Sequence, residues 1–141
     1  MKSSNLWHPT GQALLEFALV ISILIFLLMG IFDLGRVVYT NTDLSNAARE
    51  GARFAAVNHD CGTSGSSIDA VKSQVISKGI TVNIQTGQIG VTCYQAGGTT
   101  TTDKTQAATV KVSITNYPFL VITPMVGSIN LSASASMTVE Q

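Results

Sequence analysis

The feature that most restricts how this chain can fold is an uncharged apolar segment near its N-terminus. The sixteen residues from Phe17 to Phe32 carry no charge, and the apolar stretch extends back to Ala13 with Glu16 as its only interruption. At about 1.5 Å rise per residue, a helix over the twenty residues 13–32 spans roughly the 30 Å hydrocarbon core of a bilayer. The segment therefore predicts a membrane-spanning helix.

Two other interpretations of this segment stay open. One is the buried core helix of a soluble protein, although the rest of the chain is too polar to surround it. The other is an ordinary secretory signal peptide, which has an apolar centre of about 7–15 residues and a small-residue cleavage site after it. The residues that follow the run, DLGRVVYTN, contain no clear A-x-A pattern.

Composition excludes one class of function. Charged residues make up 11% of the chain, with 8 Lys and Arg against 8 Asp and Glu, whereas a typical soluble domain has about 25%. A general nucleic-acid binder needs a basic face that displaces counterions from phosphate. A chain with no net charge is not expected to have a nucleic-acid partner.

Glu16 is the one carboxylate within the apolar segment. A charged side chain costs about 2.5–3.5 kcal/mol at the centre of a membrane helix and less near its ends. In an isolated anchor, Glu16 would simply reach the headgroup region. Alternatively, Glu16 pairs with a cation of a neighbouring molecule, because an opposite charge offsets the cost of burying a carboxylate.

The motifs around Glu16 resemble those of a known family. The sequence GQALLEF at residues 11–17 matches the type IV prepilin pattern, in which a glycine precedes the cleavage site and a glutamate is fifth in the mature chain. Residues 11–57 also contain D-x-G-R at 33–36 and AAREGAR at 47–53. Together they closely resemble the TadE-like minor pilins, or pseudopilins, of bacterial tight-adherence (Flp-type) pilus systems.

The resemblance implies a processing site and an assembly site. A prepilin peptidase would remove residues 1–11 on the cytoplasmic side by cutting between Gly11 and Gln12. The new amino terminus at Gln12 would pair with Glu16 of a neighbouring subunit, with Phe17 beside it in the assembly motif. The expected partners are the inner membrane, the peptidase, other pilin and pseudopilin subunits and the pilus assembly platform, and no cofactor is implied.

The length of the chain departs from the major Flp-type pilins, which carry little beyond the helix. Here a substantial domain follows, so a minor or accessory subunit is expected. The protein would sit in the bacterial inner membrane as a single-pass protein, or in the pilus, with its N-terminus cytoplasmic and its C-terminal domain extracytoplasmic. The alternative is a single-pass accessory protein that never polymerises and binds an envelope or secretion-system partner; a further alternative is a secreted adhesion module released by signal cleavage.

The N-terminal helix is expected to continue beyond the membrane. No proline occurs between Pro9 and Pro118, so nothing stereochemically stops a helix over about 13–57. We divide it into a transmembrane part at 12–33 and an extramembrane part at 34–57. Close packing against a sheet or a neighbouring helix is expected from the small residues Ala47, Ala48, Gly51 and Ala52.

Two charged pairs lie on the same helix. Asp33 and Arg36, and Glu50 and Arg53, are each spaced i,i+3. Such pairs are usually solvated and contribute a few tenths of a kcal/mol. Contacts between subunits are the alternative for both.

The C-terminal domain, residues 58–141, shows one helical pattern followed by strand patterns. Residues 68–78 form an amphipathic helix, with Ser67 as its N-cap and Gly79 just after its end. Strict alternation then predicts half-buried antiparallel strands around 80–84, 89–93, 110–114 and 131–139, with turns or loops at 86–88 and 95–103. The expected fold is α+β and pilin-like, with the long membrane-spanning helix packed on a four-stranded antiparallel sheet together with the short helix.

The most apolar stretch outside the membrane segment is residues 117–126, YPFLVITPMV. A loop or one-turn helix that plugs the end of the sheet core is the first interpretation. Contact with lipid headgroups or with an adjacent subunit is the second.

The remaining candidates concern cysteine and catalytic chemistry. Cys61 and Cys93 are the only cysteines, and outside the cytoplasm an even count favours a disulfide, although a buried free thiol stays open for Cys93. His59 and Asp60 lie beside Cys61, yet no metal-ligand spacing supports a metal site. No nucleophile or phosphate-loop motif occurs, so an enzyme is not expected.

Overall fold

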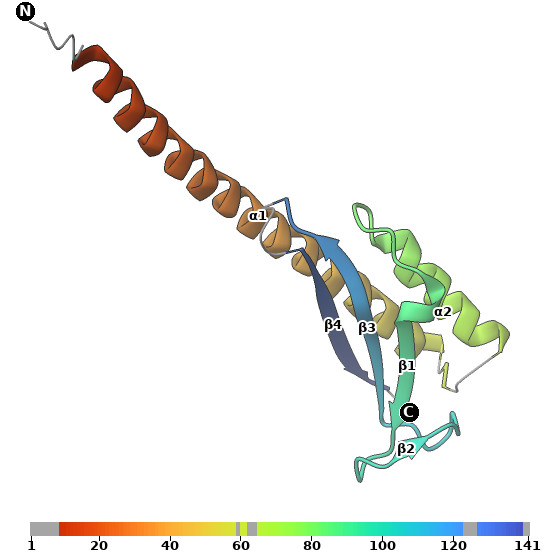
Figure 1. Cartoon of the computed structure of the whole chain (residues 1–141). Coiled ribbons are helices and arrows are strands. Elements are labelled where there is room, and N and C mark those ends of the chain that lie inside the picture. Colours follow the sequence, from red (N-terminus) through yellow and green to blue (C-terminus); the bar gives the residue numbers. More distant parts are fainter. Residues whose placement is uncertain (1–8, 59, 62–64, 123–126, 140–141) are drawn as a thin grey trace, which may run out of the picture.

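The computed structural model describes residues 9–58, 60–61, 65–122 and 127–139. Its dominant element is α1, a continuous helix from Pro9 to Asn58. The N-terminal half of α1 projects away from the rest of the molecule, and the C-terminal half lies along the sheet (Figure 1). The expected long helix and the α+β class are confirmed.

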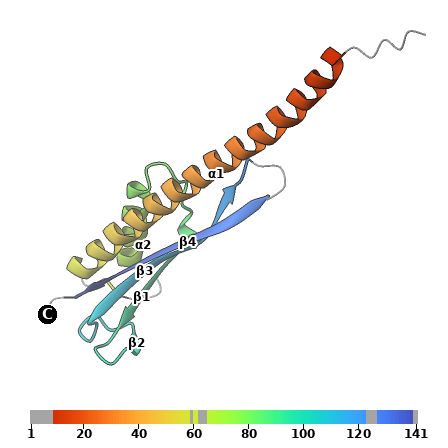
Figure 2. The same ribbon diagram turned by 90° about the vertical axis from the view of Figure 1, so that its left-hand side faces the viewer.

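The sheet has four antiparallel strands in the order β2-β1-β3-β4. Their bounds are Ile89–Tyr94 for β1, Thr100–Thr101 for β2, Thr109–Leu120 for β3 and Ser128–Thr138 for β4. The second helix, α2, runs over Ser66–Lys78 and packs beside α1 (Figure 2). A one-turn helix, η1, at Thr86–Gln88 leads into β1.

One core joins the two helices to the inner face of the sheet. Helix α2 contributes Ile68, Val71 and Val75, which are all at most 2% exposed. Alternate residues of β3 point the same way, with Val110, Val112 and Ile114 fully buried, whereas the polar residues between them lie on the outer face. The period-two pattern in the sequence therefore reports a sheet with one covered face.

The strand expected at 80–84 is wrong. Val82 and Ile84 are buried as the alternation requires, but Ile80 is 86% exposed and the segment pairs with no strand. The backbone N–H and hydroxyl of Thr81 donate instead to Oδ2 of Asp43 on α1, at 3.0 and 2.6 Å. The alternation at 80–84 thus reflects which side chains are buried. It does not mean that the segment forms hydrogen bonds with a neighbouring strand.

The fourth strand of the sheet lies where a loop was expected. Thr100 and Thr101, within the expected loop 95–103, pair with Tyr94 and Cys93 as strand β2. A two-residue strand carries too little alternation to be seen in the sequence.

The helix cap expected at Ser67 is also wrong. Helix α2 begins two residues earlier than expected, at Ser66, and Gly65 occupies the N-cap position with φ of 120°, a conformation that favours glycine. Gly79 does follow the helix, but at φ of −76°. Its role is close packing, because a Cβ there would lie 2.7 Å from Ile84 Cδ1 and 2.9 Å from Val82 Cγ2.

The apolar stretch at 117–126 is a strand at its start, not a loop or a helical turn. β3 continues through an irregularity between Ile114 and Tyr117, where Asn116 has φ of 56°, and then pairs with β4 as far as Leu120. Pro118 is tolerated there because β1 begins only at Ile89, opposite Ile114, which leaves this part of β3 at the sheet edge. Residues 123–126 of the stretch lie outside the described part of the chain.

Candidate functional site

The N-terminal part of α1 is the first candidate site, because it is apolar and exposed. All residues from Gly11 to Leu28 are exposed. Among the described residues, one helix is long and apolar enough to cross a membrane, and its most apolar window is 0% buried. The core-helix interpretation is therefore excluded, and the segment needs lipid or neighbouring helices to cover it.

Glu16 lies within this exposed segment, about one turn beyond Gly11. No hydrogen bond or ion pair involves its carboxylate within the described part of the chain. Phe17, the next residue, is 64% exposed. Both residues of the expected assembly motif are thus exposed in an isolated subunit.

Gly11 and Gln12, the expected processing site, lie inside α1 and are exposed. A Cβ on Gly11 would meet nothing within 4 Å, so the fold itself does not require glycine at this position. Residues 1–8 of the expected leader lie outside the described residues.

The small residues of α1 pack within the chain. Ala47, Ala48 and Ala52 are 0% exposed and belong to the core formed with α2 and the sheet. A Cβ on Gly51 would overlap Cγ2 of Val75 on α2. Both alternatives that the sequence left open apply within the chain, because this face packs against the sheet and also against helix α2.

A contact that the sequence did not indicate joins the end of the membrane segment to the β3–β4 hairpin. Asp33 is 5% exposed, and its Oδ1 accepts the backbone N–H of Ile122 at 3.0 Å. The same oxygen lies 3.5 Å from Nη1 of Arg36, and that guanidinium lies 5.0 Å from the ring centroid of Phe119. The Asp33–Arg36 pair therefore attaches the hairpin to the helix and is not merely a solvated surface pair.

No sequence pattern could have connected Asp33 to Ile122, because 89 positions separate them. A local i,i+3 spacing predicts the ion pair alone. The D-x-G-R motif at 33–36 indicated indirectly that Asp33 and Arg36 have a role, but it did not identify Ile122 as the partner.

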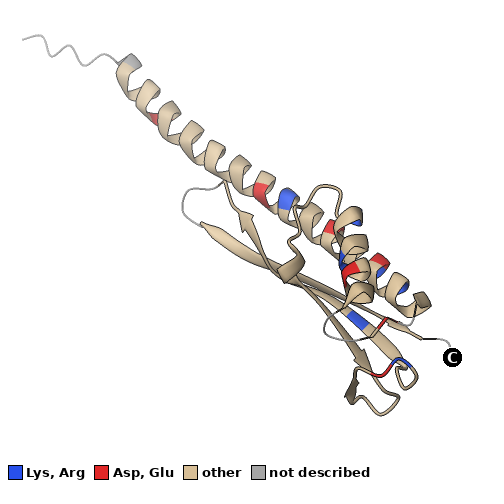
Figure 3. Cartoon of the chain, turned by 90° about the vertical axis from the view of Figure 1, so that its right-hand side faces the viewer, with Lys and Arg blue, Asp and Glu red and all other residues tan. Residues whose placement is uncertain are grey.

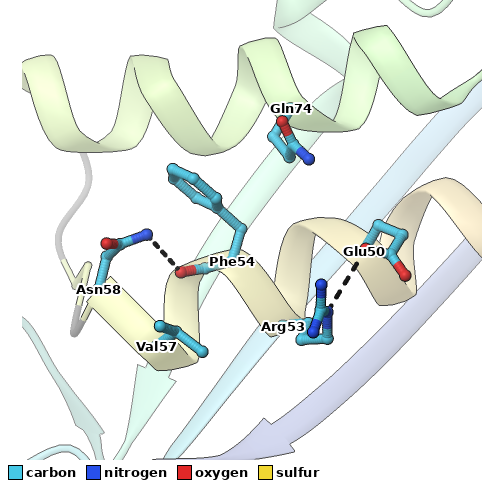
Figure 4. Close-up of a pocket in the computed structure, with 6 residues that line it drawn as sticks. All are labelled: Glu50, Arg53, Phe54, Val57, Asn58 and Gln74. Carbon is cyan, nitrogen blue, oxygen red and sulfur yellow. Dashed lines mark hydrogen bonds and ion pairs between the residues drawn. The ribbon is translucent and has the colours of Figure 1, made fainter.

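The second charged pair, Glu50 and Arg53, borders a small pocket between α1 and α2 (Figure 4). The two side chains lie 3.5 Å apart, and both are substantially exposed. The ring of Phe54 points toward α2, and the amide of Asn58 donates to the Phe54 carbonyl oxygen at 2.9 Å. At about 270 Å³, the pocket is smaller than most ligand sites.

The two cysteines join the end of α1 to the sheet. Cys61 and Cys93 form a disulfide, with a Cα–Cα distance of 5.7 Å. Next to it, Asp60 is buried and its Oδ1 lies 3.4 Å from Nζ of Lys104. The described residues contain no group of three or more His, Cys, Asp or Glu side chains that could hold a metal ion.

One carboxyl outside the membrane segment has a perturbed pKa. The backbone N–H of Thr105, and then its hydroxyl, donate to Asp103 and lower the pKa of that carboxyl. Asp103 lies on a fully exposed turn, so the shift reflects local hydrogen bonding rather than a catalytic environment.

The exposed apolar part of α1, with Glu16 as its one carboxylate, continues into the half of the helix that packs on the sheet. The molecule is therefore an α+β protein whose N-terminal helix is suited to anchor it in a membrane as a single span. Residues 11–53 match the family model described as TadE-like protein. The family resemblance expected from the sequence is thus confirmed for residues 11–53. No match was found among curated proteins or among solved structures.

Proposed function

We propose that this protein is a minor pilin, or pseudopilin, that takes part in the assembly or structure of a tight-adherence type IV pilus. The observation that carries the proposal is the N-terminal part of α1, which is exposed, apolar and marked by a single carboxylate at Glu16. The family match begins at Gly11, the residue before the expected cut. A surface of this kind is suited to bundling with the same region of other subunits.

The assembly step depends on a charge pair between subunits. Cleavage after Gly11 by a prepilin peptidase gives Gln12 a free ammonium group, and Glu16 of a neighbour supplies the opposite charge. In a low-dielectric helix bundle either charge alone is costly, whereas the pair offsets most of that cost. The pair also fixes axial register, because a shift along the helix leaves both charges unpaired.

The chain acts through surfaces and not through catalysis in this proposal. It is inserted in the bacterial inner membrane with its N-terminus cytoplasmic and the domain from residue 58 onward extracytoplasmic. The Cys61–Cys93 disulfide supports that orientation, because disulfides persist outside the cytoplasm. Its partners are the peptidase, the assembly platform and other pilin or pseudopilin subunits.

The second candidate is a single-pass accessory protein that stays in the membrane and binds an envelope or secretion-system partner. The packing of Ala47, Ala48 and Ala52 inside the domain favours it in one respect, because that helix face is not available to other subunits. The two candidates differ in whether cleavage after Gly11 matters.

A Gly11→Asp variant discriminates between them. Since a side chain at Gly11 meets nothing within 4 Å, the fold and membrane insertion are expected to stay intact. A minor pilin should keep its leader and lose pilus formation, as read from N-terminal sequencing of the membrane and sheared-fibre fractions. Gly87→Asp is the matched control, because Gly87 is also exposed with open space around it. Normal pili with uncleaved Gly11→Asp protein would contradict the proposal and select the anchored accessory protein.

A further inference from the structure

The β3–β4 hairpin reaches α1 at the point where the membrane-spanning segment ends. Every residue from Gly11 to Leu28 is exposed, whereas Met29 and Gly30 are half-buried. Asp33, the first residue after the apolar run, is buried by its contact with Ile122. The end of the hairpin is therefore level with the end of the span (Figure 1).

An apolar pocket of about 470 Å³ lies between the helix and the hairpin. On the helix side its lining begins within the span, one and a half turns before Asp33. On the hairpin side it comes from Val121, just after the end of β3, and from Ile129 in β4. The lining residues are Leu27, Gly30, Ile31, Asp33, Leu34, Val37, Val121 and Ile129. Because the same pocket is lined by span and hairpin, the end of the hairpin overlaps the last part of the span along the membrane normal.

Large apolar side chains at the level of this pocket are exposed. Leu120 and Ile122 on the hairpin are 72% and 55% exposed, and Phe32 and Leu34 on the helix are 69% and 67% exposed. Apolar side chains left uncovered beside the end of a membrane span can enter the boundary layer of the same bilayer.

The hairpin also lacks charge. No Lys, Arg, Asp or Glu occurs from Val112 to Val139, and the hairpin end is accordingly uncoloured beside the charged parts of α1 and α2 (Figure 3). Charged side chains are costly within a bilayer, and their absence lets this end approach the acyl chains.

Backbone polar groups set a limit, because lipid cannot satisfy an open N–H. At the hairpin end, the N–H of Val121 donates to the carbonyl oxygen of Gly127 at 3.2 Å, and the N–H of Ile122 donates to Asp33. Arg36 lies against Phe119 with a side chain still 47% exposed, as a side chain does when its charged group stays in the polar layer.

We propose that the hairpin end, residues 119–122 and 127–129, forms a membrane-docking surface at the level of Phe32 and Leu34 on α1. Its occupant is the bilayer itself, at the boundary between headgroups and acyl chains. Docking holds the C-terminal domain against the membrane while the chain is anchored there. The inference goes beyond the pilus role, because it applies equally to a subunit that polymerises and to one that stays in the membrane.

Tryptophan fluorescence in lipid vesicles tests this inference. The full chain, with its single tryptophan removed by Trp7→Phe, is reconstituted in phosphatidylcholine vesicles with or without lipid brominated near the headgroup end of its acyl chains. Leu120→Trp or Ile122→Trp then places an indole at the hairpin end. Val57→Trp is the control, because Val57 is 71% exposed and lies on the same helix, about 36 Å beyond Asp33.

The indole at position 120 or 122 is expected to emit at shorter wavelength and to lose about half its intensity in brominated vesicles, because an interfacial side chain sits roughly 5–10 Å into the bilayer boundary. The Val57→Trp variant should be unaffected. Hairpin variants that behave like the control would overturn the proposal. So would a blue-shifted emission that bromine does not quench and that depends on the protein-to-lipid ratio, since this result would assign the surface to a second copy of the chain.

Discussion

Two glycines of α1, Gly35 and Gly51, have opposite surroundings. Gly35 has open space beside it, whereas Gly51 lies against the side chain of Val75. A Cβ at Gly35 would meet nothing within 4 Å, whereas a Cβ at Gly51 would overlap Cγ2 of Val75. Val75 is β-branched and 0% exposed, so it cannot turn away to make room. The close approach of α1 and α2 therefore depends on glycine at position 51.

Gly51→Ala is expected to destabilise the domain by about 1–3 kcal/mol, the usual cost of overpacking a core, despite the higher helix propensity of alanine. Thermal unfolding of the full chain in detergent micelles, followed by circular dichroism, measures the change. Gly35→Ala is the matched control and should be neutral or stabilising by up to about 1 kcal/mol.

A double-mutant cycle with Val75→Ala separates the overlap from other effects. Removing the Val75 methyl groups should relieve part of the Gly51→Ala penalty, with a coupling energy of about 0.5–3 kcal/mol. Strictly additive effects of the two substitutions would show that the helices do not meet at this point.

At the residue scale, local sequence predicted which positions are buried but not their partners. The spacing of Ala47, Ala48 and Ala52 indicated a packing face, and all three are in the core. Asp33 was expected on the surface because its visible partner, Arg36, is three residues away. Its contact with Ile122 depends on how the whole hairpin is placed, which no local pattern encodes.

The elements themselves were predicted where the pattern was long. Helix α1 and strands β1, β3 and β4 follow from extended periodicity, since each covers at least six residues. Strand β2 and the unpaired segment 80–84 differ from the prediction because strand identity is set by hydrogen-bonded neighbours, and alternation measures only burial. The extension of β3 past Pro118 likewise depends on β1, which begins opposite Ile114 and leaves this part of β3 at the sheet edge.

The link between α1 and β1 is the element-scale feature with the clearest energetic consequence. The Cys61–Cys93 disulfide closes a loop of sequence separation 32, and in the chain-entropy account such a loop contributes about 3–4 kcal/mol. A Cys61→Ala, Cys93→Ala double variant is expected to lose that amount in the free energy of unfolding.

Thermal or denaturant unfolding of the double variant beside the parent chain, each with and without reductant, measures this loss. The parent should fall to nearly the level of the variant when reduced, and the variant should not respond to reductant. A parent chain that is unaffected by reduction would contradict a stabilising role for the bond.

At the scale of the whole molecule, α1 divides between two environments. Its C-terminal half is an integral part of the domain core, and its N-terminal half has no cover in the described part of the chain. The exposed apolar segment and the domain core are therefore joined by one continuous helix, without a loop between them.

The charge pair proposed between subunits can be tested on the whole assembly through Glu16→Gln. The change removes the partner of a buried ammonium group on the neighbouring subunit, and breaking such a pair costs about 3–5 kcal/mol. Incorporation into fibres should then fall by about a hundredfold to a few thousandfold, since about 1.4 kcal/mol corresponds to tenfold in an equilibrium constant. The amount of protein in the membrane should stay constant or rise, because an amide is less costly there than a carboxylate. Immunoblots of sheared fibres and of membranes from the same cells separate the two quantities. Equal fibre incorporation of the variant and the parent would show that Glu16 has no role in docking and would leave the helix as a membrane anchor alone.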